Sequence, residues 1–117
     1  MEKEIRTLKD GEILMNEGEK ATEMYYVQSG TLQASKKSGD NELIVLGTIT
    51  EKEFVGEMSF FKEIKRTATV TALGDVQVVV FAFDIFQDML GALPPWYNSL
   101  VTTLVSRLKD VEEKLVT

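Results

Sequence analysis

The sequence predicts a mainly β domain with flanking α-helices, folded as a jelly-roll-like β-roll. Between residue 5 and about residue 83, short runs of β-branched and aromatic residues alternate with glycine-containing turns, a pattern typical of all-β folds. From about residue 84 the apolar residues recur three or four apart, which is the spacing of an amphipathic helix. The 117 residues suffice for one hydrophobic core. We therefore expect a single domain over residues 1–117, with the roll at about 5–83 and C-terminal helices at about 84–116.

The first half of the roll is predicted from its strands and turns. The charged first ten residues lead into a strand at 11–15. Residues 16–19 form a turn, because asparagine and glycine tolerate the left-handed backbone that a turn needs. Residues 24–27 and 31–35 alternate like half-buried strands, and a tight turn at 28–30 separates them.

A polar hairpin tip is predicted at residues 36–41, and it connects to a strand at 42–46. Lys36 and Lys37 in this tip can be interpreted as an anion site or as solvated surface. We favour solvated surface, because lysines at a hairpin tip are most often exposed. Residues 48–53 then lead into the segment that carries the chemistry of the chain.

Two further strands are predicted in the second half of the roll. Residues 67–72 show β-branched alternation, and residues 73–75 (Leu-Gly-Asp) form a turn. The strand at 76–82 is apolar enough to be central in its sheet.

The C-terminal third predicts two helices. Asp84 is a candidate N-cap for a short helix at 85–90 that ends near Gly91, and a proline suits the first turn of the next helix. The second helix, from residue 96 to about 116, has an apolar stripe at Leu100, Leu104, Leu108, Val111 and Leu115. This stripe either packs on the roll or forms a two-helix contact between two copies, and we favour the contact between copies.

The composition excludes several classes of function. The chain has no cysteine and no histidine, so it lacks disulfides, thiol chemistry, the usual metal centre and the commonest acid–base catalyst. Its net charge of −6 argues against nonspecific nucleic-acid binding. No apolar run approaches the roughly 18 residues that span a bilayer, and we expect no signal peptide. We expect a cytoplasmic protein with no nucleic-acid or membrane partner, no catalytic residue and no metal.

The segment from Phe54 to Thr69 suits the binding of a phosphorylated sugar. Residues 57–62 can form a short helix, and the unpaired N–H groups at a helix start favour an anion. Arg66 follows, and its planar guanidinium can hold two phosphate oxygens. An ionised Glu57 can only accept hydrogen bonds, which suits a sugar hydroxyl. Together these groups match the needs of a ribose 3′,5′-cyclic phosphate.

The same segment resembles the phosphate-binding cassette of cyclic-nucleotide-binding domains, the family of catabolite activator protein and of the protein kinase A regulatory subunits. Residues 56–60 (Gly-Glu-Met-Ser-Phe) fit the family pattern in register, and Arg66, Ala68 and Thr69 fall at the expected spacing. Lys65 replaces the usual proline, which removes no ligand group. The glycines, glutamates and tyrosines between residues 11 and 30 resemble the first half of the same family.

The resemblance implies roles for particular residues. In the family the glutamate binds the ribose 2′-hydroxyl and the arginine binds the phosphate, so these roles are carried to Glu57 and Arg66. Thr67 is compatible with recognition of guanine but does not establish cGMP as the ligand. We favour cAMP. Two groups are candidates to cover the base: Val45 with Leu46, and the 104–108 region of the last helix. The expected ligand-binding residues are Gly56, Glu57, Met58, Ser59, Arg66, Thr67 and Ala68.

The leading hypothesis is a non-catalytic sensor that binds cAMP or cGMP and signals by repositioning its C-terminal helices. Its expected partner is a second copy or another protein that meets the last helix. One alternative is a degenerate β-roll that no longer binds nucleotide and serves as a scaffold. A metal-dependent enzyme of the cupin-like jelly rolls is disfavoured because that chemistry relies on histidines. A fragment of a transcription factor is a further alternative.

Overall fold

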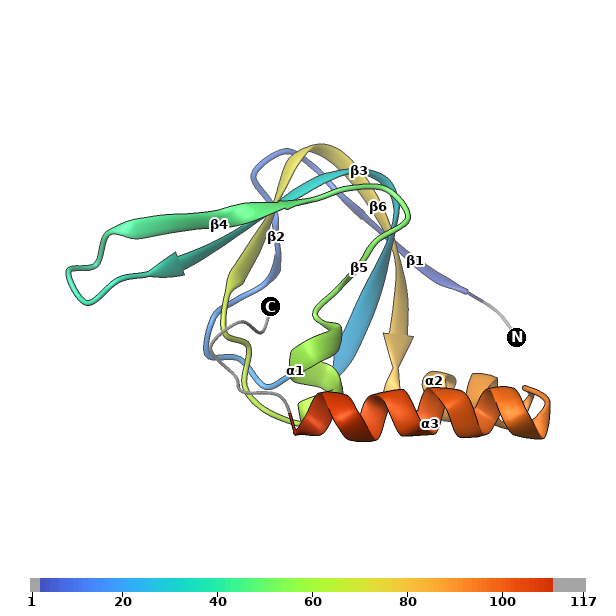
Figure 1. Cartoon of the computed structure of the whole chain (residues 1–117). Coiled ribbons are helices and arrows are strands. Elements are labelled where there is room, and N and C mark those ends of the chain that lie inside the picture. The colour runs from blue at the N-terminus through green and yellow to red at the C-terminus, as the bar shows by residue number, and fades with distance from the viewer. Residues whose placement is uncertain (1–2, 111–117) are drawn as a thin grey trace.

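The computed structural model describes residues 3–110 and has a β-roll above two C-terminal helices (Figure 1). Its architecture is mainly antiparallel β with flanking helices, which confirms the predicted fold class. The elements in chain order are β1 Glu4–Leu8, β2 Ile13–Met15, β3 Glu23–Lys37, β4 Leu43–Ile49, β5 Phe54–Val55, α1 Glu57–Lys62, β6 Thr69–Ala82, α2 Phe83–Gly91 and α3 Pro95–Lys109.

Strand β6 is the centre of the sheet, as its apolar sequence predicted. The sheet order is β1-β6-β3-β4, with β2 also paired to β6 and β5 paired to β3. Residues two apart on β6 point to the same face, and the inner series is buried. The core cluster includes Val70, Ala72, Val76, Val78 and Val80 from this strand.

The tight turns predicted at 28–30 and 73–75 are wrong, because both strands continue through these positions as one paired ribbon. Ser29 lies opposite Gln77, and Thr31 lies opposite Leu73, so the ribbon bends where β6 has extra residues. Gly30 has φ +91°, and a Cβ there would collide with the carbonyl oxygen of Asp75. Glycine at this point therefore lets the ribbon bend without reversing the chain.

The first strand begins earlier than predicted. Residues of β1 pair antiparallel with residues 76–80 of β6, and only Leu8 at its end is buried. The sequence had placed the first strand at 11–15, of which the structure keeps β2 at Ile13–Met15. The predicted turn at 16–19 is confirmed, with Gly18 at φ +89°.

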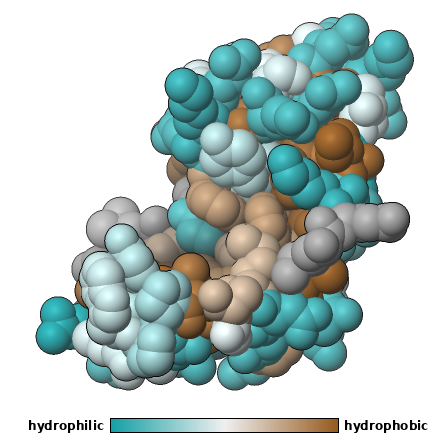
Figure 2. Space-filling view, turned by 90° about the vertical axis from the view of Figure 1, so that its right-hand side faces the viewer, coloured by the Kyte–Doolittle hydropathy of each residue, from teal (hydrophilic) through white to brown (hydrophobic). Residues whose placement is uncertain are grey.

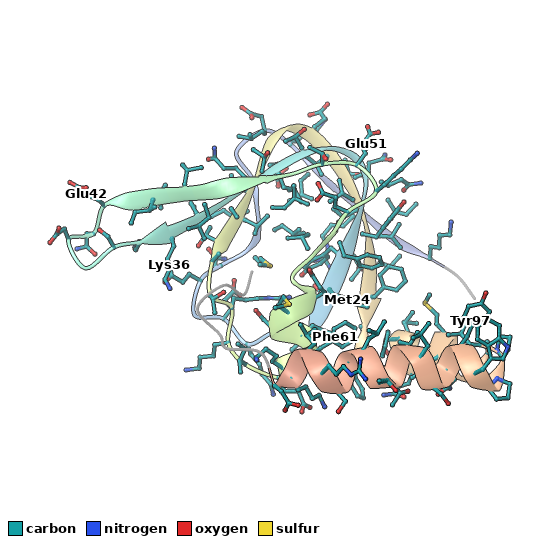
Figure 3. All side chains as sticks on the ribbon, in the orientation of Figure 1. Met24, Lys36, Glu42, Glu51, Phe61 and Tyr97 are labelled. Carbon is teal, nitrogen blue, oxygen red and sulfur yellow. The ribbon has the colours of Figure 1, made fainter. Side chains whose placement is uncertain are left out.

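The β3–β4 hairpin projects from the roll, and Figure 3 shows Lys36 and Glu42 near its end. Its polar tip is closed by the N–H of Ser38, which donates to the carbonyl oxygen of Glu42 at 2.8 Å. Lys36 and Lys37 are exposed at the start of this tip. The strand after the tip runs to Ile49, beyond the predicted end at 46.

Helix α2 begins two residues before the prediction. Its N-cap is Ala82 without a side-chain cap, so the predicted cap at Asp84 is wrong. Asp84 lies in the first turn, where its Oδ1 accepts from the N–H of Ile85 at 2.9 Å. A proline does occupy the first turn of α3, as predicted.

The apolar stripe of α3 is partly buried only toward the C-terminal end of the helix. Leu100 and Leu104 are 49% and 54% exposed, whereas Leu108 is half-buried beside α1. The predicted extension to residue 116, with Val111 and Leu115, lies outside the described residues. Across residues 3–110, no helix is both long and apolar enough to cross a bilayer.

Candidate functional site

The centre of the candidate site is the junction between β5 and α1. Strand β5 pairs with β3 through Val55 opposite Tyr25, and the chain then passes through Gly56 at φ +77° into α1. The first intrahelical bond runs from the N–H of Phe60 to the carbonyl oxygen of Gly56 at 3.2 Å. The N–H groups before Phe60 therefore have no intrahelical acceptor. The helix covers residues 57–62, as predicted.

The backbone of Arg66 is fixed by the turn at residues 16–19. The N–H of Arg66 donates to the carbonyl oxygen of Glu19 at 2.7 Å, and its own carbonyl accepts from the N–H of Gly18 at 2.8 Å. These two bonds join the backbone of Arg66 to a turn that is distant in the sequence. The left-handed glycine in the turn thus contributes to the placement of the arginine.

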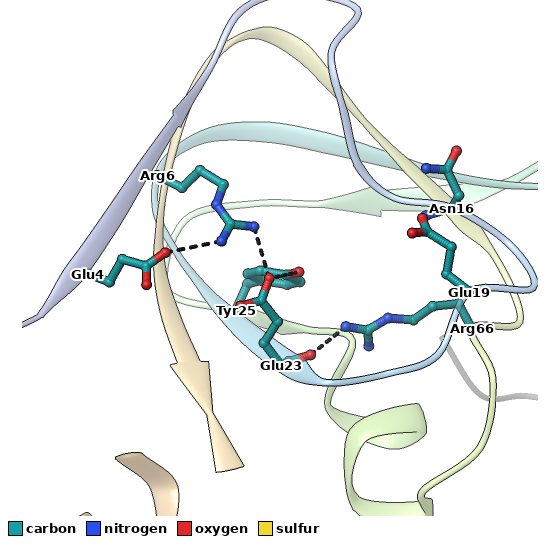
Figure 4. Close-up of polar contacts among 7 residues, drawn as sticks. All are labelled: Glu4, Arg6, Asn16, Glu19, Glu23, Tyr25 and Arg66. Atoms are coloured by element: carbon teal, nitrogen blue, oxygen red, sulfur yellow. Dashed lines mark hydrogen bonds and ion pairs between the residues drawn. The ribbon is translucent and has the colours of Figure 1, made fainter. Parts of the chain in front are cut away.

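The side chain of Arg66 is directed back toward the start of α1. It is only 4% exposed, and its Nη1 donates to the carbonyl oxygen of Gly56 at 2.8 Å. Its Nη2 donates to the backbone carbonyl of Glu23, and the guanidinium carbon lies 5.8 Å from the ring centroid of Tyr25. Figure 4 shows this approach to Glu23 and Tyr25.

Arg66 has no carboxylate within ion-pair distance in the described part of the chain. The ion pairs found there join Arg6 to Glu4 and to Glu23. Burial lowers the pKa of Arg66, because a guanidinium loses hydration when it is enclosed. A buried cation of this kind is stabilised by an anion that can reach it.

Two polar atoms at the start of α1 are buried and have no hydrogen-bond partner among residues 3–110: Oε2 of Glu57 and Oγ of Ser59. Burial raises the pKa of Glu57, and the charge of Arg66 partly opposes this shift. Buried polar groups in folded proteins are normally hydrogen-bonded. An oxygen that can accept and a hydroxyl that can donate are therefore available beside the buried arginine.

The remaining predicted site residues surround this centre. Ala68 is fully buried in the wall of the roll, whereas Met58 and Thr67 are half-buried. The structure thus places Gly56 and Arg66 in direct contact at the first turn of α1, next to Glu57 and Ser59. The residues considered as covers for the base lie elsewhere: Val45 and Leu46 are exposed on the hairpin, and Leu104 is exposed on α3.

Two neighbours of Arg66 could not be recognised from the sequence. Tyr25 was predicted as part of a strand, and Glu23 lay outside every predicted element. No local pattern indicates that either residue faces the cassette, since their contact with Arg66 depends on strand pairing. A polar cavity of about 230 Å³ borders this group and is lined by Arg6, Leu14, Met15, Glu19, Lys20, Thr22, Glu23, Tyr25 and Arg66.

An apolar cavity of about 570 Å³ lies on the opposite face of the sheet. It is lined by Tyr26, Phe54, Val79 and Phe81 from the strands and by Ile85, Met89 and Ala92 from α2 or its end, with Lys3 and Gln28. Figure 2 shows apolar side chains gathered in a hollow between the roll and the helices. Because Val79 and Phe81 alternate with the inward-facing valines of β6, this cavity lies on the other face of the sheet from Arg66, although Phe54 at the start of the cassette lines it.

Helix α1 also contacts the C-terminal helices. Nζ of Lys62 donates to the carbonyl oxygens of Leu108 and Lys109 at 3.4 and 3.2 Å, at the end of α3. The ring of Phe61 lies 5.0 Å from that of Phe86 on α2, and Figure 3 shows Phe61 above α3. The segment that carries the candidate ligand groups is thereby joined to both helices.

Comparisons with known proteins identify the family of the chain. The family model of the cyclic nucleotide-binding domain matches residues 5–92. Lysophospholipase nte1 of Neosartorya fischeri is 27% identical over 107 residues, covering 92% of this chain and 7% of that protein. The cAMP-activated global transcriptional regulator CRP of Salmonella typhimurium is 26% identical over 103 residues, covering 87% of this chain and 49% of that protein. The chain thus spans half or less of these relatives.

Among solved structures, the halfsite-occupied form of the EAL enzyme Bd1971 has a TM-score of 0.86 at 21% identity and covers 93% of this chain and 97% of that chain. Its cAMP-bound form has a TM-score of 0.69 at 23% identity, covering 92% of this chain and 29% of that chain. Its cGMP-bound form has a TM-score of 0.70 at 24% identity, covering 91% and 28%. These likenesses show the same fold. The family match extends over most of the chain, and the protein belongs to the cyclic nucleotide-binding domain family.

Proposed function

We propose that this domain is a non-catalytic sensor that binds a cyclic mononucleotide at the start of α1. The observation that carries the proposal is Arg66, a buried guanidinium beside Gly56 without a carboxylate partner within residues 3–110. A cyclic phosphate supplies the missing negative charge and accepts charge-assisted hydrogen bonds. The first N–H groups of α1 add further donors on the same side.

The sugar is assigned to Glu57. Its Oε2 is buried without a partner, and a ribose 2′-hydroxyl would supply the missing donor. Gly56 lets the backbone approach the ligand, while Met58, Ser59, Thr67 and Ala68 complete the expected binding segment. A nucleotide that lacks the 2′-hydroxyl would leave the carboxylate oxygen unsatisfied.

The preferred ligand is cAMP, with cGMP as the alternative. Support for cAMP comes from the cAMP-activated regulator among the relatives, and support for either ligand comes from the cAMP-bound and cGMP-bound forms of the EAL enzyme. Thr67, which follows Arg66 directly in the sequence, is the residue proposed to contact the guanine base if the ligand is cGMP.

The signal is proposed to leave through the C-terminal helices. Lys62 and Phe61 join α1 to α3 and α2, so a shift of α1 on ligand binding would change both contacts. The exposed side chains of Trp96, Leu100 and Leu104 on α3 offer an apolar face to a second copy or a partner protein. We propose an effector domain, enzymatic or otherwise, as such a partner, because the relatives are longer than this chain.

The test is thermal unfolding with cAMP, cGMP and AMP in parallel at about 1 mM each. A ligand with a dissociation constant of about 10 µM would stabilise the folded state by about 2.7 kcal/mol, a shift of several degrees. The proposal expects a shift with a cyclic nucleotide and none with AMP. If no cyclic nucleotide shifts the unfolding temperature, the domain is a scaffold, and Glu57 and Arg66 are remnants of a former site.

A further inference from the structure

Strand register gathers polar side chains behind Arg66. On β6, residues 78, 80 and 82 share one face, because residues two apart point the same way. Arg6 of β1 lies opposite Val78, while Tyr25 and Glu23 of β3 lie opposite Val80 and Ala82. These side chains therefore lie on the inner face of the sheet, the face from which Arg66 approaches.

The side chains form a connected network (Figure 4). Oε1 of Glu23 accepts from Nη1 of Arg6 at 2.9 Å and from the hydroxyl of Tyr25 at 2.8 Å. The backbone carbonyl of the same Glu23 accepts from Nη2 of Arg66. Arg6 also donates to Glu4 at 3.0 Å, so β1 contributes to the network.

The ring of Tyr25 is close to two guanidinium groups. The guanidinium carbons of Arg6 and Arg66 lie 5.7 and 5.8 Å from its centroid, within the range of a cation–π interaction. Tyr25 is 3% exposed, and its hydroxyl is fixed by Glu23, so the ring has little freedom to turn. Glu23 and Glu4 neutralise Arg6, whereas Arg66 has no ion pair within residues 3–110 and can take an external anion.

We propose that Tyr25, held in place by Glu23 and Arg6, is a positioning residue for Arg66 in nucleotide binding. The inference rests on the proposed function, since it assigns Arg66 to the phosphate. The guanidinium of Arg66 lies over the ring, 5.8 Å from its centroid, and is hydrogen-bonded to the carbonyl of Glu23. It is therefore oriented before the ligand arrives, so less side-chain freedom is lost on binding. Arg6 of β1 thereby influences affinity through Tyr25.

The first measurement needs no nucleotide. In the free protein, the Nε–Hε signal of Arg66, assigned through its absence in Arg66→Lys, is recorded by NMR. Tyr25→Leu removes the ring and should shift this signal, and Tyr25→Phe keeps the ring and should shift it less. Tyr26→Leu is the matched control, because that tyrosine points to the other face and contacts Phe54. An unmoved Arg66 signal in folded Tyr25→Leu would overturn the proposal, whether or not the domain binds nucleotide.

The second measurement is the affinity for cAMP and cGMP in calorimetric titrations. Tyr25→Leu should weaken binding about tenfold. Arg6→Met, which keeps the ring of Tyr25, should weaken it about threefold. Both losses are within the range expected for cation–π and charged contacts. In an Arg66→Lys background the effect of Tyr25→Leu should fall below about twofold, since a compact ammonium has no planar group for the ring to orient. An equal loss in both backgrounds would mean that Tyr25 acts only on the fold. If the wild type binds no nucleotide, the proposed function fails, and the NMR result alone decides whether Tyr25 orients Arg66. Should Tyr25→Leu not fold, Tyr25→Phe and Arg6→Met carry both measurements.

Discussion

Nη1 of Arg66 donates to the carbonyl oxygen of Gly56 at 2.8 Å, so the buried cation and the left-handed residue before α1 are in direct contact. A Cβ added at Gly56 would lie 2.7 Å from that nitrogen and 3.2 Å from Sδ of Met15. Glycine is therefore needed here for two reasons, its backbone conformation and the space occupied by the arginine.

Gly56→Ala should abolish or strongly weaken nucleotide binding. The variant combines left-handed strain of about 1–2 kcal/mol with displacement of Arg66. Gly74→Ala is the matched control, because Gly74 has φ +80° and nothing within 4 Å of an added Cβ. Calorimetric titration should show that Gly56→Ala binds the nucleotide at least about tenfold more weakly than wild type. A tenfold loss of affinity corresponds to about 1.4 kcal/mol of binding free energy. If the two variants bind with similar affinity, a clash between the added Cβ and Arg66 is not what weakens binding.

Arg66→Ala should weaken binding of a cyclic nucleotide by about thirtyfold or more. Truncating one partner of a charge-assisted hydrogen bond costs on the order of 2–4 kcal/mol, and each 1.4 kcal/mol is about tenfold. The exposed neighbour Lys65 provides the control, and Lys65→Ala should stay within about twofold of wild type, as expected of a surface charge. Equal affinities of Arg66→Ala and wild type would remove Arg66 from the site.

Glu57→Gln should stabilise the free protein at neutral pH and weaken its binding. Burial raises the folded-state pKa of Glu57 above its ordinary value of 4.5. The stability that the protonated carboxyl of Glu57 contributes is therefore fully present below its ordinary pKa. This stability is lost as the pH rises through the folded-state pKa. The gain in unfolding temperature should be largest near pH 7 and vanish near pH 4. Glu63→Gln, at an exposed position of the same segment, controls for the loss of charge.

The same Glu57→Gln variant should also lose its preference for a ribose over a 2′-deoxyribose. Competition between cAMP and 2′-deoxy-cAMP measures this ratio directly. A ratio that remains at the wild-type value would show that Glu57 does not contact the 2′-hydroxyl.

The exposed face of α3 should mediate self-association. Light scattering of the wild type should give twice the chain mass, and Leu100→Lys with Leu104→Lys should restore a monomer, because charges at an apolar contact are costly. The control places the same charges at Thr103 and Ser106, which are exposed polar positions on the same helix. A wild type that remains monomeric at all concentrations would contradict the contact between copies.

Helix α1 was predictable from the sequence because its geometry is local. Gly56 and the six residues of α1 follow short-range backbone preferences. The turn at residues 16–19 and the polar hairpin tip were predictable for the same reason. The position of Arg66 was predictable only as a spacing, because long-range bonds to the turn at residues 16–19 and to Glu23 hold it in place. The roles of Glu57 and Arg66 in binding a ligand stay predictions, and the titrations above test them.

The bends at Gly30 and Gly74 were not predictable from local pattern. A glycine with positive φ is required equally in a chain reversal and in a bent ribbon, and only the partner strand distinguishes the two. Strand β1 was missed because its apolar residues are few and it is held by pairing with β6. The start of α2 depends on Phe83, whose ring lies 6.1 Å from that of Phe60, so tertiary packing overrides the cap offered by Asp84.

The continuous pairing of β3 with β6 has a consequence for the order in which the molecule folds. Register pairs Ser35 with Thr69, and the whole cassette lies in the segment between them. Closing that long segment is the slow, entropically unfavourable step, and α1 has no surface to pack on until it is done. Pulsed hydrogen exchange during refolding should protect the amides of β3 and β6 before those of α1. The part of the chain that is proposed to meet the ligand would then be the last to form, and local opening could release it while the ribbon stays intact.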